Sequence, residues 1–307
     1  MRLDDFDPND IDVGEARQGG GMFGGFGGGG GGGGLLFGLL PLIGSRFGCG
    51  GIVVVLILLA VFGGLGNLGS LVGGGGGGPS VSQQQPHSAQ SVTQLCSADA
   101  NAHAACNAFE SAQKTWEAIF ARQGEQFQKP GLRFYSRDAQ SGCGEAQSAM
   151  GPFYCPTDHD IYLDTSFFDE LANRFGAKGD FAQDYVIAHE FGHHIQNLLG
   201  TSDKVSQIER SSDTTQGNAA SVRLELQADC FAGVWAANNR DRLDPGDIEE
   251  GLTAAHAIGD DTLQQQAQGR VVSDSFTHGT SAQRMKWLKR GIDSGDPAQC
   301  DTFSGAI

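Results

Sequence analysis

The sequence predicts an α+β domain that is mostly helical, with a small β-sheet, preceded by one transmembrane helix. Capping residues and apolar residues at helical spacing recur after about residue 165. Two short runs rich in strand-forming residues, Phe153–Cys155 and Ile161–Leu163, flank a turn. About twenty mostly apolar residues near positions 50–72 are enough for one membrane span.

The N-terminal third divides by composition. Glycine is concentrated in two tracts, Gly19–Gly34 and Gly73–Gly78. Such tracts cannot form a hydrophobic core and are typical of flexible linkers. We therefore predict four parts: a disordered acidic and glycine-rich cytoplasmic tail (1–34), an apolar membrane segment (35–72), a Gly/Ser/Gln linker (73–92) and one folded domain (93–307).

Basic residues set the expected topology. Arg17 and Arg46 precede the span, and the next Lys or Arg is Lys114. The positive-inside rule then places the N-terminus in the cytoplasm and the folded domain outside. A cleaved signal peptide is the alternative, but no A-x-A-like site follows the apolar run, which favours an uncleaved anchor.

The folded part should contain five helices after the two strands. We expect them at about 165–175, at 181–199 with Gly200 as the stop, at 219–238, from Asp244-Pro245 onward, and up to Ile292 behind a cap at Thr280 or Ser281.

The second of these helices carries an H-E-x-x-H motif, formed by His189, Glu190 and His193. Residues four apart share one face of a helix, so the two imidazoles can bind the same metal ion. Glu190 lies beside them and can move protons. This arrangement is typical of a zinc peptidase.

A third protein ligand is expected from the helix at 219–238. Glu225 and Asp229 are four residues apart, so Glu225 could complete a His2Glu set while Asp229 orients a ligand histidine. A solvated helix face is the alternative interpretation. Leu224, Leu226 and Phe231 flank the pair, which favours the metal site.

These segments resemble the gluzincin type of zincin metallopeptidase and, more narrowly, the bacterial membrane-anchored neutral zinc metallopeptidase family. The blocks that carry the resemblance lie in order between Leu132 and Phe303: Gly142–Gly144, Gly151–Pro156, Ile161–Asp164, Ala188–Gln196, Glu225–Gly233, His256–Asp261 and Phe276–Arg284. The resemblance implies a zincin-like fold, one Zn²⁺ per chain, and a protein or peptide substrate paired with an edge strand at Ile161–Asp164.

The same resemblance implies the mechanism. Zinc would activate a water molecule, Glu190 would act as its general base, and His278 would help to stabilise the oxyanion, supported by Arg284. A histidine bonded only to backbone is the alternative for His278. His194 points away from the ligand face and is expected to be a packing residue.

Six of the seven cysteines fall in the expected outer domain, and an even number in an oxidising compartment suggests three disulfides. Fifteen pairings are possible. We favour Cys96–Cys106, Cys143–Cys155 and Cys230–Cys300, the first two being close in sequence; six buried free thiols are the alternative.

The net charge of −16 argues against a nucleic-acid partner, because a polyanion would be repelled. Two other functions stay open. A peptide deformylase would use a cysteine ligand, which Cys143 could supply. A non-catalytic domain could instead hold zinc structurally or bind peptide without cutting it, and four protein donors would favour that class.

Overall fold

The computed structural model describes residues 1–17 and 88–307. The predicted span at 50–72 and most of the predicted linker lie outside these ranges. Within them, no helix combines the length and the apolar character that a membrane crossing requires. Residues 89–92, which we assigned to the linker, instead begin a helix, so the folded domain starts earlier than predicted.

One mixed sheet has the strand order β1-β2-β6-β5, and a separate hairpin pairs β3 with β4. The strands are β1 (Asp12–Glu15), β2 (Gly131–Phe134), β3 (Asp138–Ser141), β4 (Gly144–Gln147), β5 (Phe153–Cys155) and β6 (Asp160–Leu163). β1, β2 and β6 run parallel, and β5 is antiparallel to β6.

Both predicted strands are confirmed, but the prediction that Ile161–Asp164 forms the edge strand is wrong. β6 pairs with β2 on one side and β5 on the other, and all four of its residues are buried. Its last three residues, Ile161–Leu163, are hydrophobic, which is typical of a strand whose two faces are both covered. The edge strand on this side of the sheet is β5.

Nine α-helices lie in the described residues: α3 (Ala89–Cys96), α4 (Ala100–Gln123), α5 (Ser166–Asn173), α6 (Asp180–Leu198), α7 (Thr201–Ser211), α8 (Thr214–Asn238), α9 (Asp247–Ala257), α10 (Asp260–Gln268) and α11 (Ser281–Ser294). The five predicted helices are confirmed as α5, α6, α8, α9 and α11. The domain is therefore mostly helical and α+β.

The boundaries follow local chemistry. Gly200 adopts a left-handed conformation (φ 70°) between α6 and α7, which a residue with a side chain adopts at a cost. Thr280 caps α11 in a capping box with Gln283. Of the two predicted caps, Thr280 and Ser281, the structure therefore confirms Thr280. α8 begins at Thr214 because the Asp213 side chain accepts a hydrogen bond from the Gln216 N–H.

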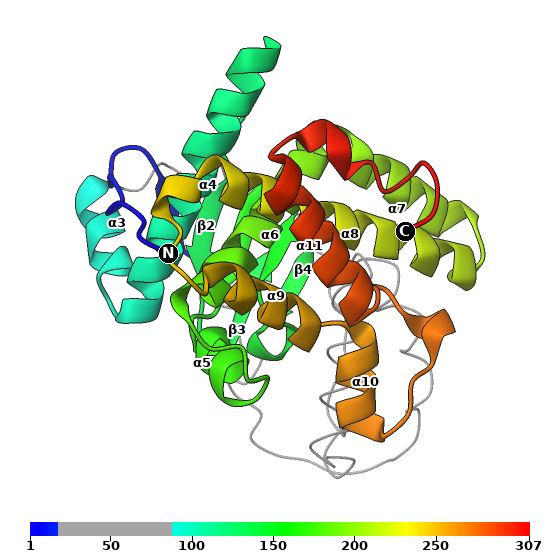
Figure 1. The fold of residues 1–307 in the computed structure, drawn as a ribbon. Coiled ribbons are helices and arrows are strands. Elements are labelled where there is room, and N and C mark those ends of the chain that lie inside the picture. The colour runs from blue at the N-terminus through cyan, green and yellow to red at the C-terminus, as the bar shows by residue number, and fades with distance from the viewer. Residues whose placement is uncertain (18–87) are drawn as a thin grey trace, which may run out of the picture.

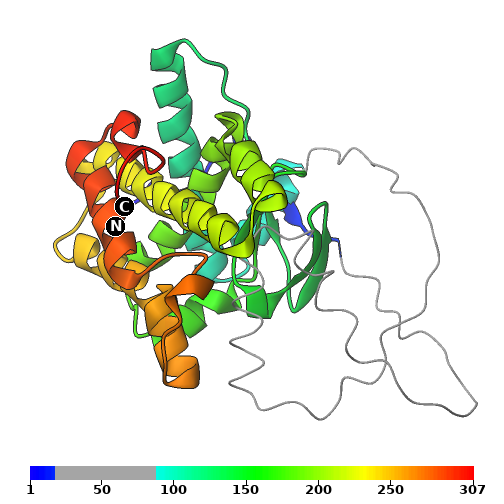
Figure 2. The same ribbon diagram turned by 90° about the vertical axis from the view of Figure 1, so that its right-hand side faces the viewer.

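The helix α6 lies at the centre of the domain. It packs against β5 and β6, and also against α4, α8 and α9, while α11 lies across α8 (Figure 1). The strands lie on one side of the molecule and α8 with α11 on the other (Figure 2). A Cβ atom at Gly192 of α6 would lie 2.9 Å from the carbonyl oxygen of Ala228 of α8, so the two helices approach as closely as their backbones allow.

The acidic N-terminal segment is not a disordered tail over the residues that the structure describes. Residues 1–17 pack on the domain, and β1 forms the outer strand of the sheet. Val13 is fully buried and Ile11 nearly so. The prediction failed because the acidic residues are conspicuous in the sequence, whereas the short pattern that buries Ile11 and Val13 depends on a distant partner strand.

Candidate metal centre

Two helices bring together the three predicted ligands. His189 and His193 project from α6, and Glu225 projects from α8. His189 Nε2 lies 3.2 Å from Glu225 Oε2, and His193 Nε2 lies 3.6 Å from Glu225 Oε1. One ligand atom from each residue lies within 4.8 Å of the others, a spacing that can hold one ion.

Hydrogen bonds fix the direction of both imidazoles. His189 Nδ1 donates to Asp229 Oδ1 at 2.8 Å, as predicted for Asp229, and His193 Nδ1 donates to Gln196 Oε1 at 2.8 Å. Both Nε2 atoms therefore face Glu225, where each can bind a metal ion once it carries no proton. Ligand histidines in zinc proteins commonly use their second ring nitrogen in this way.

Asp229 is itself held by two further side chains. Arg284 donates to both carboxylate oxygens at 2.9 Å, and the Tyr185 hydroxyl donates to Oδ1 at 2.6 Å. Asp229 is fully buried and Arg284 is 2% exposed. Burial alone would raise the pKa of Asp229, but the Arg284 and His189 charges hold it well below its usual range. The carboxylate therefore stays ionised.

The surroundings of the three candidate ligands stabilise a positive charge at this site. Burial lowers the pKa of His189, but the Asp229 and Glu225 carboxylates outweigh this effect and raise it to about 9. Burial likewise opposes ionisation of Glu225, while the His193 and His278 charges hold its pKa far below the ordinary value. Two neutral imidazoles and a carboxylate fit Zn²⁺, with room for a fourth position.

Glu190 follows His189 on α6 and borders the same cleft. Its side chain is buried, and burial raises its pKa above the ordinary glutamate value. A carboxylate whose pKa is raised is a stronger base than an ordinary glutamate and holds a transferred proton more readily. The structure therefore places a proton acceptor next to the metal ligands.

His278 also borders the cleft, and Asp260 holds it there. Its Nδ1 lies 3.2 Å from Asp260 Oδ1, while Asp260 Oδ2 accepts the backbone N–H groups of Thr277, His278 and Gly279. These contacts leave the Nε2 atom of His278 without a partner in the described part of the chain, and the residue lines the cleft. His278 is thus bonded to a carboxylate through its side chain and is close enough to Glu225 to lower that residue's pKa.

A family model described as "Putative neutral zinc metallopeptidase" matches residues 9–303, which is almost the whole chain.

The chain belongs to this family.

Two relatives illustrate the similarity. "Uncharacterized protein YpfJ" of Escherichia coli (strain K12) is 49% identical over 262 residues, which cover 85% of this chain and 88% of the relative. "Uncharacterized protein Rv2575" of Mycobacterium tuberculosis (strain ATCC 25618 / H37Rv) is 44% identical over 223 residues, or 68% of this chain and 74% of the relative. No solved structure matches the chain.

In this member of the neutral zinc metallopeptidase family, the three candidate ligands His189, His193 and Glu225 lie in a cleft of about 1200 Å³. We call the β3–β4 hairpin with β5 the strand wall, because residues from Gln140 to Tyr154 line one side of the cleft. Residues of α5, α7 and α10 line other sides, including Phe167, Val205 and Leu263.

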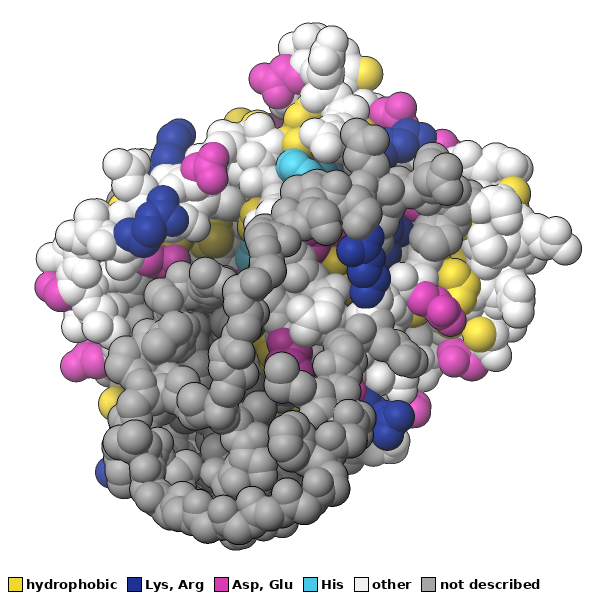
Figure 3. Space-filling model, turned by 180° about the vertical axis from the view of Figure 1, so that it is seen from behind, with side chains coloured by type: hydrophobic (Ala, Val, Ile, Leu, Met, Phe, Trp, Pro, Cys, Tyr) yellow, Lys and Arg dark blue, Asp and Glu magenta, His cyan; other side chains and the backbone are white. Residues whose placement is uncertain are grey.

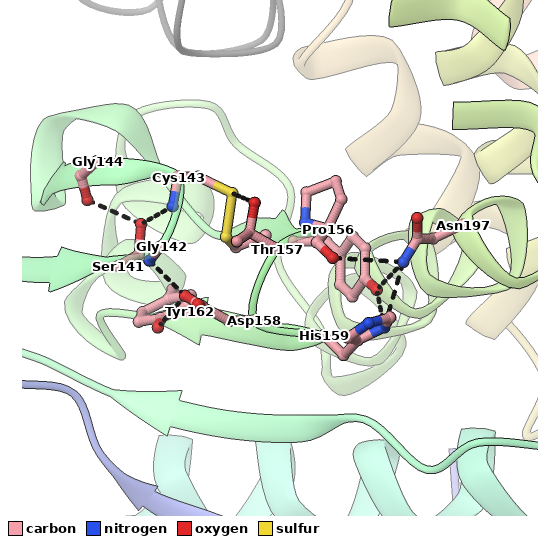
Figure 4. Close-up of a disulfide and its surroundings, with 12 residues drawn as sticks. Ser141, Gly142, Cys143, Gly144, Pro156, Thr157, Asp158, His159, Tyr162 and Asn197 are labelled. Carbon is pink, nitrogen blue, oxygen red and sulfur yellow. Dashed lines mark hydrogen bonds between the residues drawn. A yellow bond between two sulfur atoms is a disulfide. The ribbon is translucent and has the colours of Figure 1, made fainter. Parts of the chain in front are cut away.

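The strand wall is held by the Cys143–Cys155 disulfide (Figure 4). All three predicted disulfides are present, the others being Cys96–Cys106 and Cys230–Cys300. Because Cys143 is bonded to Cys155, it has no thiolate to offer a metal, which removes the deformylase alternative. Asn197 of α6 donates to Tyr154 and Pro156 beside the disulfide and so ties the wall to the ligand helix.

His194 is a packing residue, as predicted. Its Nδ1 accepts from the Tyr154 hydroxyl at 3.0 Å, and its Nε2 donates to the Gln128 carbonyl oxygen at 2.7 Å. It is fully buried, and burial lowers its pKa to about 4. Both nitrogens are engaged, so His194 is not a ligand.

Sequence reasoning missed three supporting residues: Gln196, Tyr185 and Asp260. Gln196 follows His193 by three positions, a spacing that could have indicated a contact. Tyr185 precedes His189 by four positions and could have been found in the same way. Asp260 and His278 are far apart in sequence, so only the fold reveals that the Asp260-Asp261 pair anchors the His278 loop and the start of α11.

Proposed function

We propose that the protein is a zinc metallopeptidase. One observation carries the proposal: both motif histidines are locked through Nδ1, so that two Nε2 atoms and the Glu225 carboxylate converge at the cleft beside Glu190. Three protein donors leave a coordination position open, which is typical of a catalytic rather than a structural zinc site.

The residues of the chain divide the chemistry among them. Zinc, when bound, lowers the pKa of a water molecule and polarises a carbonyl group. The Glu190 carboxylate accepts a proton from the attacking water and delivers it to the leaving amine. His278, held by Asp260, donates from Nε2 to the oxygen that gains negative charge.

The substrate is a peptide in extended conformation. Within residues 1–17 and 88–307, the outer edge of β5 pairs with no strand, and its residues Phe153 and Tyr154 border the cleft, so a substrate backbone can add to the sheet there. Such pairing recognises the peptide backbone and does not depend on side chains. We therefore assign substrate pairing to β5, whereas the prediction from sequence placed it at Ile161–Asp164, most of which forms β6.

We further propose a membrane-attached protein with its peptidase domain in an extracytoplasmic compartment. Three disulfides support an oxidising environment. The apolar run of the sequence supports membrane attachment. Nucleic acid is not expected as a partner: the net charge is −16, and acidic and basic side chains intermix on the described part of the face in Figure 3.

The first test compares wild type with Glu190→Gln in cleavage of an unfolded generic protein, with bound zinc quantified in both. The full chain is used, because residues 1–17 belong to the domain. Glu190→Gln should keep zinc and lose about a hundred- to ten-thousand-fold in turnover, the usual contribution of general base catalysis. Glu225→Ala should lose zinc affinity as well.

Full activity in Glu190→Gln would refute the mechanism. Zinc in both proteins with cleavage in neither would favour the alternative, a non-catalytic domain that holds zinc and binds peptide. A fourth protein donor in the zinc coordination sphere, measured by X-ray absorption, would favour the same alternative.

A further inference from the structure

The N-terminal segment, residues 1–17, is built into the sheet. β1 pairs in parallel with β2 from Asp12↔Gly131 to Glu15↔Phe134. The pairing continues beyond the strand, since the Ala16 N–H donates to the Phe134 carbonyl oxygen at 2.8 Å. Val13 is fully buried beneath this pairing. The segment therefore supplies both backbone partners and core surface.

The N-terminal segment also supplies ion-pair partners for charged side chains of the domain. Arg133 of β2 is 3% exposed and lies between two carboxylates: Nη2 is 2.6 Å from Asp12 Oδ2, and Nε is 2.9 Å from Asp160 Oδ2. Without Asp12 the buried guanidinium would keep one carboxylate, that of Asp160, and the Leu132 carbonyl oxygen as partners. Lys129 pairs with Asp10 at 2.5 Å.

A face of α4 bonds to the backbone of the same segment. Asn107, Glu110 and Gln113 are spaced by three residues, so they share one side of the helix. Asn107 and Glu110 accept the N–H groups of Phe6 and Asp7 at 3.0 and 2.8 Å, and Gln113 Nε2 donates to the Asp10 carbonyl oxygen at 2.9 Å. Glu110 and Gln113 are buried, and buried polar groups need such partners.

We propose that the edge of β2 and this face of α4 are a docking surface for the chain's own N-terminal segment, and that residues 1–17 and 88–307 therefore occupy the same side of any membrane. Backbone pairing and a shared core require one aqueous compartment, because a bilayer core is roughly 30 Å thick. The family match, which begins at residue 9, includes β1. A shared side differs from the sequence prediction, in which one span separates a cytoplasmic N-terminus from an outer domain.

Cysteine accessibility tests the placement. In a full-length chain carrying Cys49→Ser, Asp5→Cys reports on the N-terminal segment and Lys289→Cys on the domain; both native side chains are well exposed (85% and 59%). A membrane-impermeant maleimide is applied to intact cells, to spheroplasts and to lysed cells. Equal labelling of the two variants in every preparation is expected. Labelling of one in spheroplasts and of the other only after lysis would overturn the proposal.

A second measurement tests docking itself. Asp10→Cys combined with Lys129→Cys, whose native side chains touch, is treated in membranes with a short thiol-reactive cross-linker. A cross-linked peptide pair within one chain, found by mass spectrometry, is the expected result. Equal maleimide labelling without this cross-link would overturn the docking surface, and a cross-link only between two chains would assign the segment to a second copy.

Discussion

The ligand helices α6 and α8 and the strand wall border the same cleft, but different interactions fix their positions. The ligand helices are held by close backbone packing at Gly192 and by a buried network around Asp229. The strand wall is held by the pairing of β5 with β6, by a disulfide, one of whose sulfurs belongs to the partly exposed Cys143, and by polar contacts at its turn. The difference indicates that the candidate ligands are positioned by a buried, close-packed network, whereas the strand-wall side of the cleft depends on backbone pairing and a few separable cross-links.

Removing the guanidinium from the buried network should have the largest effect. Arg284→Met leaves the Asp229 carboxylate buried without its cation, which costs about 3–5 kcal/mol of unfolding free energy. Zinc affinity should also fall by about 10–100-fold, because Asp229 no longer holds His189 firmly. Chelator competition measures the affinity, and thermal unfolding measures the stability.

The exposed Lys286, on the same helix, provides the matched control Lys286→Met. Arg284→Met with zinc affinity equal to that of this control would mean that the network does not position the ligand.

Opening the strand wall should change substrate binding and leave the metal in place. Cys143→Ser combined with Cys155→Ser removes a cross-link between residues 12 positions apart and should lower the unfolding free energy by about 3 kcal/mol. KM should rise, with kcat and zinc content unchanged, since β5 loses its tie to the hairpin. Peptide cleavage at several substrate concentrations separates KM from kcat.

Cys96→Ser with Cys106→Ser is the matched control, since this disulfide closes a loop of similar length away from the cleft. Equal KM changes in the two double variants would assign the effect to general destabilisation.

The smallest effect concerns His194, which joins the two regions through Tyr154. Its folded pKa of about 4 lies below the ordinary histidine value of 6.5, so the unfolded chain binds more protons between these pH values. Stability from this group is present above pH 6.5 and is lost as pH falls toward 4. Between pH 7 and 5.5 the loss should be about 1 kcal/mol.

Denaturant unfolding at both pH values measures this loss in wild type and in His194→Gln. The variant should show a smaller loss than wild type by that amount. His256→Gln, at an exposed position, is the control and should behave as wild type. An identical pH dependence in wild type and His194→Gln would show that burial does not depress this pKa.

The difference between contacts within one helix and contacts between distant segments explains which site residues could be predicted from the sequence. His189, His193, Glu225 and Asp229 were predictable because each pair is four residues apart on one helix. Arg284, which binds Asp229, and Asp260, which binds His278, come from other helices, and no local spacing in the sequence indicates these contacts. Strand β1 was misread for the same reason: the buried Val13 becomes meaningful only beside Leu132, more than a hundred positions away.

Gly192, the fourth residue of the H-E-x-x-H motif, has a geometric consequence for the candidate metal site. A methyl group there would lie 2.9 Å from Ala228 O and 3.0 Å from its Cα, so the helices would separate by a few tenths of an ångström. Such a separation would move His189 and His193 of α6 away from Glu225 of α8, whose facing atoms lie 3.2 and 3.6 Å apart. The single hydrogen atom at this position therefore keeps the two ligand helices close enough for one site to form between them.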